Sequence, residues 1–128
     1  MSAPARSPQI AVLVLGDPSV VQARAHGLRL RGFAAFVAQD EAELTWLLSV
    51  ARVRPDYAVV DLSTTADPVS DRVTRLVAMA RLATLASLPV VLVGAGDDEA
   101  RFFRRVLARF PRDPGDAAIL SVLAKSAA

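Results

Sequence analysis

Short apolar runs alternate with longer amphipathic stretches along most of the chain. An apolar run of four to six residues, bounded by turn-forming residues, is typical of a strand that is buried on both faces. Such runs occupy residues 10–15, 33–38, 57–62 and 90–93, and residues 106–110 either end a helix or form a fifth strand. The amphipathic stretches between the runs predict helices, and strands that alternate with helices form a parallel sheet.

Aspartates mark where the predicted helices begin. Asp17 comes directly before a proline, which is the pattern of a helix cap, and Gly32 predicts the end of that first helix. Asp40 is followed three residues later by Glu43, as in a capping box, which predicts the start of the second helix. The later helices also begin at aspartates, namely Asp67, Asp97 and Asp113.

Five strand–helix units in one small domain predict an α/β fold of flavodoxin-like (βα)5 type. Its three layers would be a parallel sheet in the strand order 2-1-3-4-5 with helices on both faces. Residues 1–8 are predicted to be a flexible tail, residues 9–125 the domain, and residues 126–128 a frayed end. Trp46, in the second helix, is expected to lie half-buried against the sheet, and the alternative is an exposed side chain that anchors a partner.

Composition narrows the classes of function. The chain has 128 residues, which fits one domain, and no apolar run approaches the roughly 18 residues that span a bilayer. Residues 1–8 lack the apolar stretch of a signal peptide, so we expect a cytoplasmic protein with no membrane contact. The absence of cysteine excludes disulfides, thiol catalysis and cysteine metal sites.

Positive charge is concentrated in one stretch although the net charge is only +2. Five arginines occur there without an intervening acid: Arg101, Arg104, Arg105, Arg109 and Arg112. This pattern indicates either a solvated helix face or a docking surface for an acidic partner. Nucleic acid is not indicated, because no aromatic-interleaved basic motif or helix-turn-helix pattern accompanies the arginines.

Asp61 is the first candidate for chemistry, because it directly follows the apolar residues 57–60. A carboxylate at the carboxyl end of a parallel strand lies where open α/β sheets place their functional sites. Four segments around it resemble the receiver domain of bacterial two-component response regulators, in the order and spacing of that family: residues 17–20, 31–33, 54–62 and 88–93. The resemblance covers nearly the whole chain and implies that Asp61 stands at the phospho-acceptor position.

The other positions that this family uses for phosphorylation are altered. The acidic pair that binds Mg²⁺ maps to Leu15 and Gly16, with Asp17 one position late. Neither Leu15 nor Gly16 can bind a hard cation. The switch threonine or serine maps to Gly94, and the lysine near the end of the fifth strand maps to Arg112, which we also expect to pair with Asp61. No cofactor is expected, and Mg²⁺ would bind only if Asp17 and Asp61 formed a working site.

Three hypotheses follow. The leading one is a non-enzymatic, receiver-like signalling module that contacts another signalling protein or a second copy of itself, through Arg101, Phe102, Arg104, Arg105 and Arg109. The second is a working receiver that a histidine kinase phosphorylates on Asp61. The third is a flavodoxin-type binder of a small ligand, with a pocket near Gly16, Ser63 and Gly94.

Overall fold

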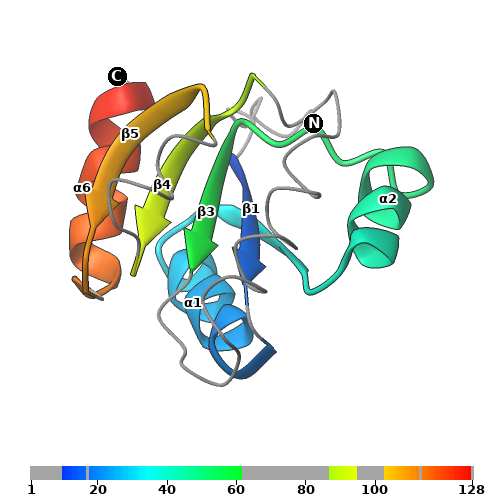
Figure 1. The fold of residues 1–128 in the computed structure, drawn as a ribbon, viewed down its shortest axis with the longest axis horizontal. Coiled ribbons are helices and arrows are strands. Elements are labelled where there is room, and N and C mark those ends of the chain that lie inside the picture. The colour runs from blue at the N-terminus through cyan, green and yellow to red at the C-terminus, as the bar shows by residue number, and fades with distance from the viewer. Residues whose placement is uncertain (1–9, 17, 62–86, 95–102, 113, 128) are drawn as a thin grey trace, which may run out of the picture.

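The computed structural model describes residues 10–16, 18–61, 87–94, 103–112 and 114–127. The elements in chain order are β1 (Ala11–Gly16), α1 (Pro18–Leu30), β2 (Ala34–Ala38), α2 (Glu41–Ser49), β3 (Tyr57–Asp61), β4 (Pro89–Val93), β5 (Arg105–Phe110) and α6 (Asp116–Ala127) (Figure 1). The helices predicted from Asp67 and Asp97 lie outside the described residues. None of the described helices is long and apolar enough to cross a membrane.

The five strands form one parallel sheet in the order β2-β1-β3-β4-β5. This order confirms the predicted flavodoxin-like fold. Residues 106–110 belong to β5, so the strand alternative for this segment is confirmed. Because all strands run the same way, their carboxyl ends meet at one edge of the sheet, where Gly16, Asp61 and Phe110 lie.

Side chains alternate between two cores, one on each face of the sheet. The α2-side core consists of the buried residues Leu13, Leu15, Ala38, Leu44, Ala58, Val60, Val90 and Leu92. The α1/α6-side core consists of Val12, Val14, Val21, Ala25, Leu28, Ala35, Tyr57, Val59, Val91, Val93, Ile119 and Leu123. The three inner strands β1, β3 and β4 therefore contribute apolar side chains to both cores, as expected for the centre of a three-layer fold.

Local signals fix two of the described helix ends as predicted. The Asp40 carboxylate accepts a hydrogen bond of 2.8 Å from the Glu43 backbone N–H, and the Glu43 carboxylate accepts one of 3.0 Å from the Gln39 N–H. Gly32, at φ +94°, follows the end of α1, where the Phe33 N–H donates back to the Leu28 carbonyl.

Two local expectations are wrong. The last helix begins at Asp116 and not at Asp113, because Gly115 has a φ of +85°, which is outside the helical region. Trp46, with 56% of its surface exposed, matches the alternative of an exposed side chain and not the expectation that it packs against the sheet. Leu44, Leu47 and Leu48 provide the side of α2 that packs on the sheet, and Trp46 lies on its outer side.

Candidate functional site

Asp61 is the last residue of β3 and lies at the carboxyl edge of the sheet. It is paired with Gly16 of β1 and with Val93 of β4, so it occupies the middle of that edge. Its side chain shares a face with Tyr57 and Val59, because side chains two residues apart point the same way. The carboxylate therefore points toward the layer of α1 and α6, and only 2% of the residue is exposed.

Arg24 of α1 supplies the positive charge beside this carboxylate. Its Nη2 donates to Asp61 Oδ2 over 3.2 Å, and both side chains are buried. The second terminal nitrogen, Nη1, donates to Oδ1 of Asp116. One guanidinium thus joins two carboxylates and ties β3 to both helices on that face of the sheet.

Asp116 has a suitable place for this contact. It is the first residue of α6, and a negative charge is stabilised at the amino end of a helix, where the backbone N–H groups point outward. Gly27 of α1 makes the room for it, since a Cβ atom on Gly27 would lie 2.0 Å from Asp116 Oδ2. A larger residue at position 27 would push Asp116 away from Arg24.

Arg24 is the site residue that the sequence interpretation missed. Asp61 had been expected to pair with Arg112, but Arg112 is exposed beyond the end of β5, and the guanidinium that reaches Asp61 is that of Arg24. A signal for Arg24 exists in the sequence. Residues 21, 24, 25 and 28 fall on one side of a helix, and the other three belong to the α1/α6-side core. An arginine in such an apolar stripe needs a buried partner.

The positions of the acidic pair cannot place carboxylates beside Asp61. Gly16 has φ +155°, and a Cβ atom there would lie 2.5 Å from the Asp61 carbonyl oxygen and 3.2 Å from Val21 Cγ1. Leu15 is buried in the α2-side core, which is the opposite face of the sheet from the Asp61 side chain. Asp17 lies outside the described residues. A metal that required ligands from Leu15 and Gly16 therefore does not fit this edge.

Gly94 also has a conformation that suits glycine. It follows β4 with a φ of +71°, in a region that β-branched residues rarely adopt, and its N–H donates to the Phe110 carbonyl over 2.7 Å. Phe110 is the last residue of β5 and directly precedes Pro111. The hydrogen bond from Gly94 therefore joins the residue after β4 to the end of β5. Arg112 lies two residues further along.

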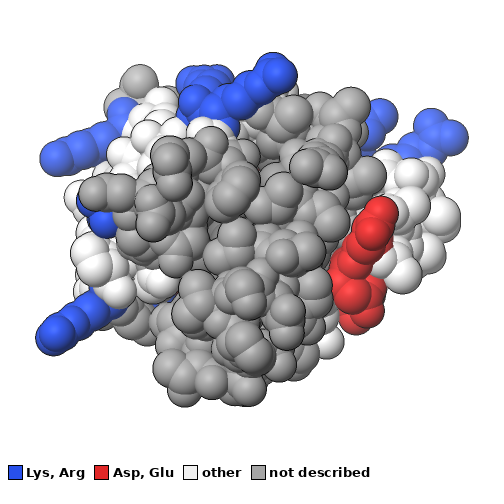
Figure 2. Space-filling model, in the orientation of Figure 1, with Lys and Arg blue, Asp and Glu red and all other residues white. Residues whose placement is uncertain are grey.

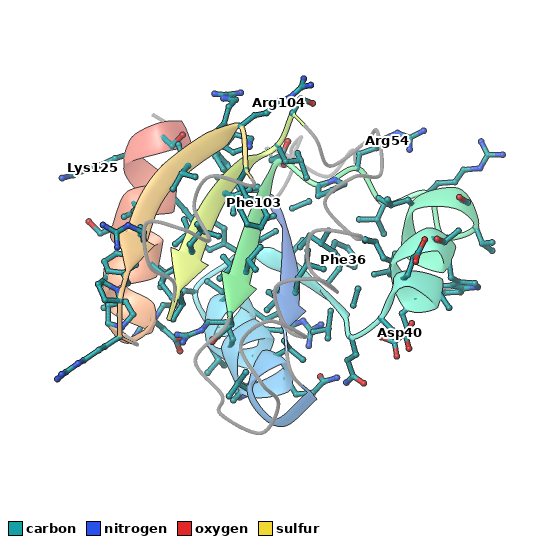
Figure 3. The ribbon with its side chains drawn as sticks, in the orientation of Figure 1. Phe36, Asp40, Arg54, Phe103, Arg104 and Lys125 are labelled. Atoms are coloured by element: carbon teal, nitrogen blue, oxygen red, sulfur yellow. The ribbon has the colours of Figure 1, made fainter. Side chains whose placement is uncertain are left out.

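The arginines of the candidate partner face lie on more than one side of β5. Arg104 and Arg105 are exposed at the start of this edge strand, as Figure 3 shows for Arg104, and Arg109 is exposed near its end. A register shift between Val90 and Val91 leaves Leu107 without a partner, so Arg105 pairs with Pro89 but Arg109 with Leu92. Arg105 and Arg109 consequently project to opposite faces. Arg101, Phe102 and Ser63 lie outside the described residues.

In the part of the chain that the structure describes, no three carboxylate or imidazole side chains gather into a group that could hold a metal ion. The Asp61 carboxylate instead forms an ion pair with the Arg24 guanidinium. This arrangement can hold a buried negative charge in place and fix the distance between the sheet and two helices.

The comparisons with known proteins agree with the fold. No protein-family model and no curated protein matches the sequence. Several solved structures match the fold. One is the chemotaxis response regulator CheY4 of Vibrio cholerae, with a TM-score of 0.61 and 17% identity, over 92% of this chain and 98% of that one. A response regulator receiver protein from Pseudomonas putida gives a TM-score of 0.63 and 21% identity, over 94% of this chain and 99% of that one.

A third structure, a response regulator from Burkholderia pseudomallei, contains a phosphorylated aspartic acid and a calcium ion. Its TM-score is 0.59 and its identity 21%, over 90% of this chain and 66% of that one. At these identities the likeness concerns the fold, which is that of CheY-like receiver domains.

The first prediction concerns the ion pair. Arg24→Met keeps most of the side-chain length but leaves the Asp61 carboxylate buried without its guanidinium, so the free energy of unfolding should fall by about 3–5 kcal/mol. Adding Asp61→Asn should recover much of this loss, because an amide carries no charge to be paired. Urea denaturation of Arg24→Met, Asp61→Asn and the double variant gives the free energies of unfolding from which the coupling is calculated.

Arg29→Met is the matched control for this experiment. Arg29 lies on the same helix and donates to the Ala35 carbonyl over 2.7 Å and 3.0 Å, but it is exposed. Its loss should cost only about 1 kcal/mol. Equal effects of the Arg24 and Arg29 substitutions, or strict additivity of Arg24→Met and Asp61→Asn, would show that Arg24 and Asp61 are not coupled.

The second prediction concerns Gly16. Gly16→Asp restores an acid at a position of the acidic pair, but its Cβ atom would collide with the Asp61 carbonyl. We expect a loss of about 2 kcal/mol or more of stability and no gain of Mg²⁺ affinity. Thermal unfolding with and without Mg²⁺ measures both. A variant that is stabilised by Mg²⁺ would mean that this edge can rearrange into a metal site.

Proposed function

We propose that the chain is a receiver-like signalling module that acts by contact with other proteins, without Mg²⁺-dependent phosphorylation of Asp61 and without enzymatic turnover. The observation that carries this proposal is the buried contact between the Arg24 guanidinium and the Asp61 carboxylate. The receiver-like fold supports a role in two-component signalling, and the contact at Asp61 supports an atypical one.

The physical argument starts from what phosphoryl transfer requires. The protein contributes mainly the positioning of the reacting groups and the neutralisation of the charge on the transferring phosphoryl group. A donor must also reach the accepting oxygen. Asp61 is 2% exposed, its Oδ2 already accepts from Arg24, and the neighbouring strand ends in Gly16, which has no side-chain carboxylate for a metal. Binding of a metal ion beside Asp61 and access of a phosphoryl donor to its carboxylate would both require Arg24 to move away from that carboxylate.

A candidate partner surface that does not include Asp61 lies at the amino ends of the strands. Arg104 (Figure 3) and Arg105 are exposed where β5 begins, whereas Asp61 is the last residue of β3. Arginine is enriched among the residues that contribute most to protein interfaces, and an acidic partner would complement these side chains. Binding there would not require any change at Asp61.

Beryllofluoride, which mimics a phosphoryl group on aspartate, tests the proposal directly. Amide NMR spectra of the labelled protein should not change when beryllofluoride and Mg²⁺ are added. The amide signals of Gly16, at the end of β1, and of Gly94, directly after β4, are the reporters at the carboxyl ends of the strands. A receiver with an intact acidic pair serves as the positive control. Saturable, Mg²⁺-dependent shifts that are absent in Asp61→Asn would instead establish a working receiver.

A further inference from the structure

The outer side of α2 carries an apolar stripe that nothing in the fold of the described residues explains. Trp46 is 56% exposed and Val50, the residue after the helix, is 65% exposed. They are four residues apart, as are Ala42 and Trp46, so the three side chains lie on one side of the helix. Leu44, Leu47 and Leu48 pack on the sheet from its inner side. This short helix is therefore apolar on two sides, which is unusual for a helix at a surface.

A shallow, open groove lies along this stripe. Its lining residues are Glu41, Ala42, Thr45, Trp46, Ser49 and Val50. All six belong to α2 or to its C-cap, so the groove follows the helix from its first residue to its end. An elongated segment that lies alongside α2 would cover all of it.

The two ends of α2 carry opposite charges. Glu41 lines the groove at the amino end, while the neighbouring Asp40 and Glu43 side chains take part in the cap. Arg52 and Arg54 are exposed just beyond the carboxyl end. Figure 3 shows Asp40 and Arg54 at opposite ends of the helix, and Figure 2 shows acidic and basic side chains separated in the same way around α2.

Arg52 has an unfavourable backbone conformation for its residue type. Among the described residues it is the one non-glycine residue with a positive φ, at +56°. It lies in the turn that ends α2, where the Val53 N–H donates to the Leu47 carbonyl and where glycine is the common choice. The turn thereby places an exposed arginine side chain directly after the carboxyl end of α2.

We infer that α2 is a dimerisation surface, on which α2 of a second copy of this chain lies antiparallel across a two-fold axis at Trp46. The sequence along the helix is acidic, apolar and basic, and an antiparallel copy presents the same sequence in reverse. Trp46 then meets Trp46 of the second copy, Ala42 faces Val50, and Glu41 faces Arg52 and Arg54. Such a pairing is closed, because each copy uses the same surface.

The dimer should be weak and sensitive to salt. A helix of nine residues is only about 14 Å long, so its contact area falls below the roughly 1,200 Å² of small stable interfaces. Its ion pairs are exposed and are screened by salt. The inference goes beyond the proposed function, since it does not depend on whether Asp61 is phosphorylated: α2 packs on one face of the sheet, and the Asp61 side chain points to the other.

Sedimentation equilibrium of the full chain from micromolar to millimolar concentration tests this inference. The wild type should pass from monomer to dimer. Glu41→Arg alone, or Arg52→Glu with Arg54→Glu, would place like charges opposite each other and should weaken dimerisation by about tenfold or more. An equimolar mixture of the two variants should restore it, because both ends of the mixed dimer then pair opposite charges.

Two further variants separate this surface from non-specific association. Trp46→Ser should abolish the dimer, whereas Leu30→Ser, which removes a 73% exposed apolar side chain at the end of α1, should leave it unchanged. Circular dichroism checks that each variant is folded. A wild type that remains monomeric at every concentration overturns the inference. A dimer that persists in Trp46→Ser, or a charge-reversed mixture that stays monomeric, overturns it as well.

Discussion

The ion pair between Arg24 and Asp61 is the interaction on which the rest of the site depends. A carboxylate at the end of a buried parallel strand is costly unless a positive charge stabilises it. In this chain the charge comes from α1, and the same guanidinium reaches Asp116 at the start of α6. The glycine at position 27 lets the two helices approach closely enough for that contact. The edge of the sheet that carries the candidate site is thereby held together by the protein's own side chains.

The altered positions around Asp61 are consistent with one another. Gly16 leaves no space for a side chain beside the Asp61 carbonyl, Leu15 points into the opposite core, and Gly94 has a backbone conformation that disfavours threonine. We expect that an acid at position 16 or a threonine at position 94 would not fit without a backbone change, because a Cβ atom on Gly16 lies against the Asp61 carbonyl and Gly94 has a positive φ. The surfaces proposed for binding lie elsewhere, on the outer side of α2 and at the start of β5, so they can work while Asp61 stays unmodified.

The sequence predicted the parts of the structure that depend on local pattern. The apolar runs predicted the strands, and the alternation of five strands with helices predicted the fold type from which the strand order was taken. Asp40 with Glu43 predicted the start of α2, because a capping box involves neighbouring residues only. It did not give the partner of Asp61, because that contact joins residues 37 positions apart and depends on how α1 lies on the sheet. The helical period places Trp46 about opposite Leu44, Leu47 and Leu48, so the exposed alternative for Trp46 agreed better with the sequence than packing against the sheet did. The late start of α6 depends on the φ of one glycine, Gly115, which the Asp113–Pro114 pattern obscured.

A crystal structure of the protein grown with a high concentration of Mn²⁺, with anomalous diffraction recorded for manganese, would show whether Asp61 can bind a metal ion. Mn²⁺ binds to the same kinds of oxygen ligand as Mg²⁺ and can be located unambiguously. The account predicts no manganese at Asp61, with the Arg24 guanidinium within hydrogen-bond distance of its carboxylate. Manganese bound to Asp61, with Arg24 displaced from it, would contradict the account and identify the chain as a receiver that opens to accept its metal.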